Sequence, residues 1–311
     1  MMKLPRLVIF GEALTDFIRD DTNRWHSVAG GACWNVARVG ARLGAPTGFA
    51  GAVSADIFGD ELMRKSAEAG LDMRFTQQVD RPPLLAMVVA TRPPQYFFVG
   101  ENSADLAFDP TALPPDWLEA VEIVHFGCLG LVREPLASRL IDIARVVRAA
   151  GKRISFDPNF RAPMADPSYR DTLRTMVGLS DYIKVSDEDL TGLFPELDEA
   201  AALARIRAWA PQAAVLVTRG AAGMELFAGE ETVVQPGFKV TVADTVGCGD
   251  ACVGSWMASL LTHPEAAAAE HLRFAAACAA LVASRAGAYA PTEAEVQALI
   301  AASIATASAA Q

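Results

Sequence analysis

One segment of the chain, from Asp244 to Cys252, combines residue types that could bind an anion and move a proton. Gly247 and Gly249 allow main-chain N–H groups to approach a ligand, and the helix predicted to start here adds unpaired donors and partial positive charge. Asp250 falls in the first helical turn, where its carboxylate could take the proton of a hydroxyl as a phosphoryl group arrives. A second interpretation stays open, in which Asp250 only caps the helix and the glycines only shape a turn.

A second glycine pair, Gly30 and Gly31, opens another predicted helix, which ends at Gly44. The main chain can again approach a ligand closely, and Asn35, one turn into the helix, offers both a donor and an acceptor to hydroxyl groups. Asp16 follows the first predicted strand, at the place where open α/β sheets collect ligand groups, although it could instead cap a turn. These residue types suit a polyol.

Three further polar clusters follow buried-strand runs, at residues 157–161, 184–189 and 218–223. They are predicted to lie at the same edge of a sheet, where ligands bind in α/β proteins. Arg161 could hold a phosphate group with its fork of N–H donors, or it could form a surface ion pair of little consequence. His125 lies inside a strand-like run, and we predict that it is a buried core histidine.

Strand-like and helical runs alternate along the chain, which predicts an α/β fold with a doubly wound, mostly parallel sheet and helices on both faces. Segment 235–242 is predicted to be a strand leading into the glycine turn at Asp244 to Cys252. Runs at 17–28 and 84–99 are predicted to form a small separate sheet, with a turn at 20–23 and another around 92–95. The other strands are predicted at 7–18, 49–54, 123–126, 153–157, 182–185 and 214–218, and helices at 135–150, 264–286 and 292–305.

Composition bounds the class of protein. The 311 residues are 52% hydrophobic, enough for a large core, and no second domain is indicated, so we expect one domain over 1–311. A net charge of −10 without a Lys/Arg cluster argues against nucleic acid as a partner. No run is long enough to span a bilayer and no signal segment is visible, so no membrane partner is expected. Five scattered cysteines predict reduced thiols in a cytoplasmic protein.

With these clusters the chain resembles the ribokinase-like (PfkB) carbohydrate kinase family over nearly its whole length. Residues 29–37, Ala-Gly-Gly-x-x-x-Asn-Val-Ala, are similar to the family's N-terminal signature, and residues 244–251 are similar to its C-terminal signature. Residues 218–223 resemble the strand end at the family's nucleotide site, and residues 285–292 resemble the loop that closes its adenine site. The resemblance is greatest to bacterial fructokinases, through residues 11–16, 100–105, 157–161 and 184–188.

The resemblance implies transfer of the γ-phosphoryl group of ATP to a sugar hydroxyl, with Mg²⁺, and with K⁺ as a further candidate ion. It implies a lid formed by about residues 14–29 and 84–108, and we predict a homodimer in which two lids pair, because a thin sheet would otherwise expose apolar surface. Asp250 is implied to act as base, Asp244 to help bind a monovalent cation, and Asp189 to belong to the magnesium environment. The implied catalytic residues are Asp250, Gly247, Cys248, Gly249 and Arg161; the sugar-binding residues are Asp16, Gly30, Gly31, Asn35, Asn102, Arg161 and Asp250; the nucleotide-binding residues are Lys184, Ser186, Thr218, Gly220, Gly223, Gly249 and Gly287.

The reaction predicted by the resemblance is conversion of fructose to fructose 6-phosphate, and two alternatives stay open. A 2-keto-3-deoxygluconate kinase shares Asp-x-Asn-x-Arg but would need a further cation near the lid, where the runs carry Arg19, Arg24 and Arg92. A sugar-binding sensor that has lost catalysis is the alternative of another class. A dinucleotide oxidoreductase is disfavoured, because no Gly-x-Gly-x-x-Gly follows the first predicted strand.

Three positions depart from the family pattern. Cys248 and Cys252 stand where Ala and Phe are usual, and Val99 replaces a tyrosine common in the lid strand of related sugar kinases. Ser186-x-x-Asp189 stands in place of an Asn-x-x-Glu element, which alters the predicted magnesium and phosphate environment.

Overall fold

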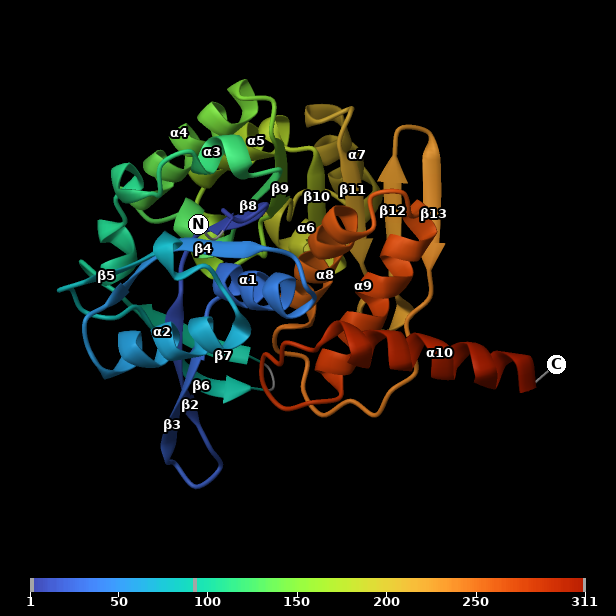
Figure 1. Ribbon diagram of the computed structural model, residues 1–311, viewed down its shortest axis with the longest axis horizontal. Helices are drawn as coiled ribbons and strands as arrows, with labels where there is room; N and C mark the ends of the chain where they lie inside the picture. Colours follow the sequence, from blue (N-terminus) through green and yellow to red (C-terminus); the bar gives the residue numbers. More distant parts are fainter. Residues whose placement is uncertain (1–2, 92–93, 310–311) are drawn as a thin grey trace.

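The computed structural model describes residues 3–91 and 94–309, and its strands and helices alternate along the chain (Figure 1). Among these residues the main sheet has nine strands, in the order β13-β12-β11-β10-β9-β8-β1-β4-β5. All neighbours from β11 to β5 pair in parallel, and β12 and β13 are antiparallel additions at one edge. The strands are β1 (Leu7–Phe10), β4 (Thr47–Ser54), β5 (Thr76–Val79), β8 (Ile123–Gly127), β9 (Arg153–Asp157), β10 (Tyr182–Ser186), β11 (Ala214–Thr218), β12 (Met224–Ala228) and β13 (Glu231–Gln235).

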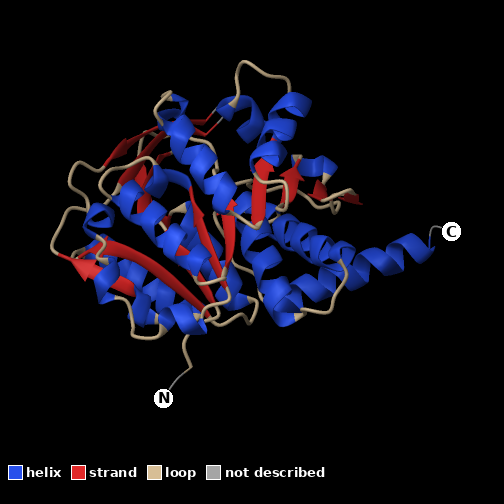
Figure 2. Ribbon diagram, turned by 90° about the horizontal axis from the view of Figure 1, so that it is seen from above, coloured by secondary structure: helices blue, strands red, loops and turns tan. Residues whose placement is uncertain are grey.

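Helices cover both faces of this sheet (Figure 2), because successive strand residues point to opposite sides. Leu7 and Ile9 of β1 pack into one core with α1, α8 and α9, whereas Val8 and Phe10 pack into a second core with α4, α5 and α7. The predicted doubly wound, mostly parallel fold is confirmed. The helices are α1 (Ala32–Arg42), α2 (Ile57–Ala69), α3 (Trp117–Ala120), α4 (Leu136–Ala149), α5 (Tyr169–Leu179), α6 (Asp187–Leu193), α7 (Glu199–Trp209), α8 (Cys248–Thr262), α9 (Ala268–Ala283) and α10 (Glu293–Ala309).

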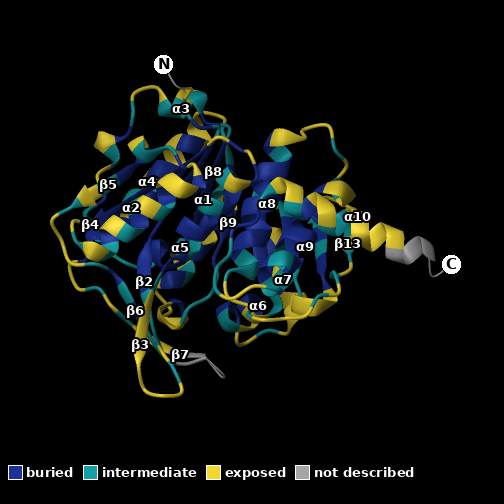
Figure 3. Ribbon diagram, turned by 60° about the horizontal axis from the view of Figure 1, so that its bottom comes forward, coloured by how far each residue is buried: buried dark blue, intermediate teal, exposed yellow. Residues whose placement is uncertain are grey.

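A small sheet stands off the body, and the β2–β3 hairpin extends furthest from it (Figure 3). Its strands, in spatial order, are β3 (Trp25–Gly30), β2 (Leu14–Arg19), β6 (Leu85–Thr91) and β7 (Pro94–Val99). Both hairpins are antiparallel, and β2 and β6 join them in parallel. A turn does occur at 20–23, as predicted, whereas the turn predicted around 92–95 includes Arg92 and Pro93, which lie outside the described residues.

Two strand predictions are wrong. Residues 236–242 form no strand: Pro236 lacks an N–H donor, and Gly237 lies so close to the main chain of Ala221 that an added Cβ would be 2.4 Å from its oxygen. The alternation of apolar and polar residues from Phe238 to Val242 therefore has no sheet neighbour. Segment 7–18 is divided between β1 and β2, which belong to different sheets, because the chain turns at Gly11.

The strand order places a ligand site at one edge of the main sheet. β1 lies between β4 and β8, so the order of the parallel strands reverses there, and ligands in open α/β sheets bind beside the carboxyl ends of the strands at such a reversal. The predicted polar clusters follow β9, β10 and β11 at this edge. No helix in the described part of the chain is long and apolar enough to cross a membrane.

Candidate active site

Asp250 is a buried carboxylate in the first turn of α8, with 7% of its surface exposed. Its Oδ2 atom accepts a hydrogen bond of 2.8 Å from the side-chain amide of Asn35 on α1. Its Oδ1 atom accepts a longer bond of 3.4 Å from the side-chain amide of Asn159, which follows β9. Three segments distant in sequence therefore meet at one carboxylate, and both of its oxygens are held in place.

The surroundings of Asp250 favour proton acceptance. Burial raises the pKa of Asp250 above its ordinary value, while the Asn35 amide, Arg161 and Lys184 act in the opposite direction. A carboxylate with a raised pKa is a stronger base than an exposed one, and a base is most effective when its pKa approaches the working pH. The position thus suits a group that takes the proton of a bound hydroxyl.

The turn ahead of α8 packs against the predicted closing loop. Gly247 has a φ of +80°, and a Cβ added there would lie 2.8 Å from the Cβ of Ala288. Asp244 accepts a hydrogen bond of 2.9 Å from the main-chain N–H of Gly287. The two sequence motifs are therefore in direct contact, although some forty residues separate them in the sequence.

Main-chain donors at the start of α8 are partly free. The N–H of Cys248 donates to the carbonyl of Thr245 at 3.3 Å, so this donor is used inside the turn. The N–H groups of Gly249 and Asp250 have no hydrogen-bond partner within residues 3–91 and 94–309. Burial raises the pKa of the Cys248 thiol to about 11, so this side chain stays neutral. Two free donors and the positive end of a helix make the turn suited to an anion.

The turn after β9 fixes Asn159. Its φ of +43° is uncommon for a residue other than glycine, and neighbouring side chains hold it there. The main-chain N–H of Asn159 donates to Oδ1 of Asp157 at 2.9 Å. Arg161 donates from Nη1 to the side-chain oxygen of Asn159 at 2.7 Å and to its main-chain oxygen at 3.1 Å. These bonds leave the Asn159 amide directed at Asp250.

Lys184, predicted to contact the nucleotide, lies in a buried ionic group and is 4% exposed. Its ammonium nitrogen is 3.2 Å from Oδ2 of Asp157 and 3.5 Å from Oδ2 of Asp189. Burial opposes the charge of Lys184, but the two carboxylates raise its pKa above the ordinary value, so the ammonium stays protonated. Its nitrogen also lies beneath the start of α8, 3.3 Å from the point where Gly249 would carry a Cβ.

The glycine pair before α1 accommodates Asp16. A Cβ on Gly30 would lie 2.4 Å from Oδ2 of Asp16, and Gly31 has a φ of +112°. Burial raises the pKa of Asp16 to about 6, while Arg161 lowers it and Asp250 raises it further. The structure thus brings together four of the predicted sugar-site or catalytic residues, from β2, from α1, from the turn after β9 and from α8. These four are Asp16, Asn35, Arg161 and Asp250.

The predicted nucleotide residues lie further along the same sheet edge. Ser186 and Thr218 are register partners at the ends of β10 and β11. Ser186 caps α6 by accepting the N–H of Asp189 at 2.9 Å, and Asp189 accepts the N–H of Ser186 in return at 2.7 Å. Gly220 is exposed, whereas Gly223 is required by packing, because its Cβ would lie 2.2 Å from the carbonyl oxygen of Gln235. Their contact with a nucleotide stays a prediction.

Asn102, predicted to bind sugar, is exposed in the loop after β7 and has a φ of +54°. Arg133 anchors this loop to the body by bonding to Gly100, Ser103 and Asp105. The role of Asn102 in sugar binding stays a prediction.

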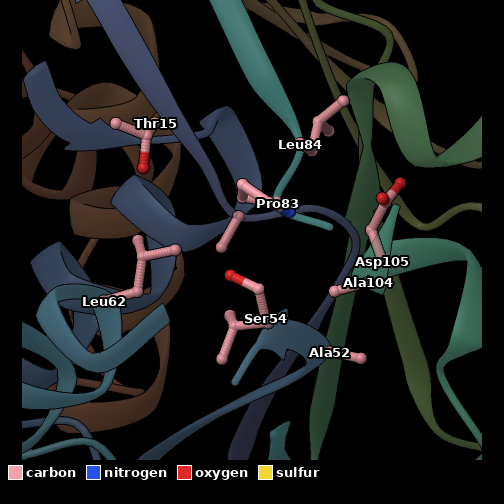
Figure 4. A pocket seen from close by; sticks show the side chains of 10 residues that line it. Thr15, Ala52, Ser54, Leu62, Pro83, Leu84, Ala104 and Asp105 are labelled. Atoms are coloured by element: carbon pink, nitrogen blue, oxygen red, sulfur yellow. The ribbon is translucent and has the colours of Figure 1, made fainter. Parts of the chain in front are cut away.

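A small cavity lies at the base of the small sheet, and Asp250 is not among the residues that line it (Figure 4). Figure 4 shows Thr15 and Leu84 from the small-sheet side, Ser54 from β4, and Asp105 around it. No residue predicted here for catalysis or nucleotide binding lines this cavity. Its lining residues are Ala13, Thr15, Ala52, Val53, Ser54, Leu62, Pro83, Leu84, Ala104 and Asp105.

Glu12, which the site predictions did not include, is a buried carboxylate between β1 and β2. Oε2 accepts the N–H of Gly130 at 2.9 Å, whereas Oε1 has no partner among the described residues. Burial raises the pKa of Glu12 to about 7, although main-chain N–H groups oppose this. The Gly11-Glu12 dipeptide was visible in the sequence, but its burial depends on contacts with Gly130 that the sequence does not reveal.

The raised pKa of Glu12 has a consequence for stability. In the unfolded chain Glu12 has a pKa of about 4.5, whereas the folded protein keeps this proton up to about pH 7. The free energy of unfolding therefore falls as the pH rises from about 4.5 through 7. Glu12→Gln should remove up to ~3 kcal/mol of this fall, because one pKa unit corresponds to about 1.4 kcal/mol. Urea unfolding at pH 5 and pH 8 measures it, with the exposed Glu230→Gln as control. The expectation would be contradicted if the free energy of unfolding changed equally between pH 5 and pH 8 in Glu12→Gln and in wild type.

The chain is similar over most of its length to known proteins of one family. A model described as pfkB family carbohydrate kinase matches residues 4–295. A fructokinase of Klebsiella pneumoniae is 32% identical over 293 residues, which cover 91% of this chain and 94% of that protein. A solved fructokinase with bound ATP from Xylella fastidiosa aligns with a TM-score of 0.87 and 30% identity over 96% of this chain and 99% of that one. A fructokinase from Vibrio cholerae in its fructose-, ADP- and calcium-bound form aligns with a TM-score of 0.83 and 26% identity, over 96% and 99% of the two chains.

The ribokinase-like fold and these relatives define a sugar kinase. The chain belongs to the pfkB family of carbohydrate kinases.

Proposed function

We propose that the protein transfers the γ-phosphoryl group of ATP to the 6-hydroxyl group of fructose, giving fructose 6-phosphate and ADP. The observation that carries this proposal is Asp250, a buried carboxylate held by two amides at the start of a helix with free N–H groups. The ATP in the Xylella fastidiosa relative and the fructose and ADP in the Vibrio cholerae relative support the choice of donor and acceptor.

The acceptor side is formed by Asp16, Asn35 and Asp250. Oδ1 of Asn35 is buried without a partner among the described residues, and this acceptor fits a sugar hydroxyl. Asp250 takes the hydroxyl proton late, as the new oxygen–phosphorus bond forms and the bond to the leaving ADP oxygen breaks. The N–H groups of Gly249 and Asp250 and the guanidinium of Arg161 face the charge that spreads over the transferring oxygens.

The donor side uses the edge formed by β10, β11 and the closing loop, where Ser186, Thr218, Gly220, Gly223 and Gly287 are proposed to contact ATP. Mg²⁺, when bound with ATP, neutralises charge on the phosphate oxygens. Asp189 stays a proposed part of the magnesium environment but not a direct ligand, because its oxygens accept the N–H groups of Phe160 and Ser186 and face Lys184.

Asp244 fits a monovalent cation such as K⁺. Its two oxygens each accept one main-chain bond, from Val246 at 3.1 Å and from Gly287 at 2.9 Å, and each retains a further lone pair.

A cytoplasmic location belongs to the same proposal, since all five cysteines are free thiols.

ADP release across fructose, 2-keto-3-deoxygluconate, ribose, glucose and adenosine tests the proposed function. Fructose should give the highest kcat/KM. A clearly higher value for 2-keto-3-deoxygluconate would overturn the choice of sugar, and no ADP release with any acceptor would favour the sensor. The Asp250→Asn variant, purified identically, controls for contaminating kinases.

We also propose that the small sheet is a lid and that two lids pair in a homodimer. Trp25 is 41%, Tyr96 37%, Phe97 54% and Val99 48% exposed on the edge strands β3 and β7, and apolar side chains exposed on a thin sheet favour a cover. Phe17 is not one of these exposed side chains, because its ring packs against Phe58 of α2 with a centroid distance of 5.5 Å.

Light scattering should therefore give twice the chain mass at micromolar concentration. Phe97→Glu should reduce the mass to that of one chain, because a charge would be buried without a partner at the pairing surface. Val146→Glu changes an equally exposed valine on α4, 53% exposed, and should leave the mass unchanged. A monomeric wild type would rule out the dimer.

A further inference from the structure

We propose that Lys184 is a positioning residue for phosphoryl transfer: through Asp157 and Asp189 it holds the turn that directs the Asn159 amide at Asp250. This inference rests on the proposed function, since it names the residue that supports the base. It assigns Lys184 a role other than the nucleotide contact predicted from the sequence.

The ammonium of Lys184 is placed between two carboxylates that each hold a different part of the turn. Oδ2 of Asp157 faces Lys184 at 3.2 Å, while Oδ1 of the same residue accepts the N–H of Asn159 at 2.9 Å. Oδ2 of Asp189 faces Lys184 at 3.5 Å, while its Oδ1 accepts the N–H of Phe160 at 2.7 Å. One buried cation therefore fixes two successive main-chain N–H groups through two carboxylates.

The turn held in this way is strained and directed. A positive φ at Asn159 costs free energy and persists only where neighbours enforce it. Arg161 completes the enclosure by bonding to the side chain of Asn159 and to the carbonyl of Phe160 at 2.8 Å. This series of bonds ends at the side-chain amide of Asn159, which donates to Oδ1 of Asp250.

Burial separates this role from ATP binding. Lys184 is 4% exposed, and both of its ionic partners are also buried, Asp157 at 3% and Asp189 at 5%. If the ammonium left these carboxylates to bind a phosphate, two buried carboxylates would lose their ionic partner, which is costly. Its position beneath Gly249 instead supports the first turn of α8 from below.

Steady-state kinetics of Lys184→Met, Asn159→Ala and the double variant test the proposal. Each single variant should lower kcat by ~10- to 100-fold, since a misplacement near 1 Å can cost that much, while the KM for ATP changes by less than about threefold. Because Lys184 acts through Asn159, the double variant should lose no more than about threefold beyond Asn159→Ala alone.

Removing the cation could unfold the protein, so Lys184→Met/Asp157→Asn provides a second route. This double variant removes one positive and one negative charge, so the net charge of the buried group is unchanged. Residue 157, which accepts the N–H of Asn159, then no longer has an ionic partner. Circular dichroism establishes folding. Val147→Ala controls for loss of stability alone and should keep wild-type kcat. Val147 is fully buried in the core, near the C-terminal end of α4.

The outcomes separate the alternatives. A KM for ATP raised tenfold or more with kcat retained would make Lys184 a nucleotide contact and overturn the proposal. A kcat equal to that of Val147→Ala, or multiplicative losses in the Lys184→Met/Asn159→Ala variant, would also overturn it. An inactive wild type would instead refute the proposed function, which the same assay reports independently.

Discussion

Asp250→Asn should lower kcat by ~10² to 10⁴ while the protein remains folded, because asparagine lacks the basic lone pair that accepts the hydroxyl proton. Asparagine caps a helix about as well as aspartate, so the start of α8 should persist. The variant also places an amide donor against the amide of Asn35 or of Asn159, each of which now donates to a carboxylate oxygen. Stopped assays of ADP release at saturating sugar and ATP measure the loss.

The matched control is Asp56→Asn, the same substitution at a helix cap outside the site. Asp56 accepts the N–H groups of Phe58 and Gly59 at the start of α2, at 2.9 and 3.0 Å. Its variant should keep near-native kcat. If Asp250→Asn behaved like this control, the assignment of Asp250 as base would be lost, and the cap interpretation would replace it.

Gly254→Val should destabilise the protein by about 3 kcal/mol and reduce activity at temperatures where wild type is stable. A Cβ at this position of α8 would lie 2.7 Å from the carbonyl oxygen of Val36 and 2.9 Å from the Cβ of Val39, both on α1. Extra volume at a tight helix contact typically costs ~1 to 3 kcal/mol, and here the obstacle includes main chain that cannot move aside. Since Asn35 and Asp250 belong to the two separated helices, kcat should fall as well.

Gly178→Val provides the comparison for that experiment. Gly178 also lies in a helix, α5, but is exposed, and the nearest atom to its added Cβ is the Trp209 carbonyl oxygen at 3.8 Å. Its replacement should change stability by less than about 1 kcal/mol, from helix propensity alone. Equal losses at both glycines, measured by chemical unfolding, would show that helix packing is not the cause.

The sequence predicted the main elements of the fold because local signals and tertiary structure agree there. The glycines before α1 and α8 adopt the positive φ values or close contacts that make glycine necessary, so their pattern carried structural information. The antiparallel strands β12 and β13 were not predicted, since five-residue strands of mixed composition lack a strong periodic signal. Residues 236–242 show the opposite failure, a strand-like alternation without a neighbour to pair with.

The site was predictable in its residues more than in its connections. The resemblance implied that Asp16, Asn35, Arg161 and Asp250 belong to one site, and the structure brings these four side chains together. The partners of Lys184 were not predicted, because a lysine followed by acidic residues is equally typical of a solvated helix start. Only the folded arrangement of β9 beside β10 shows that its charge is enclosed.

The site combines residues from the small sheet with residues held by the main sheet, and this has a consequence for how such enzymes diversify. Asp16 belongs to β2 of the small sheet, whereas Asn35 and Asp250 belong to helices packed on the main sheet. Under the proposed function, mutations in β6 and β7 change the acceptor side of the site without changing the turn at the start of α8. We therefore expect that exchanging residues 84–99 between relatives changes the preferred acceptor while Asp250 keeps its proposed role as base.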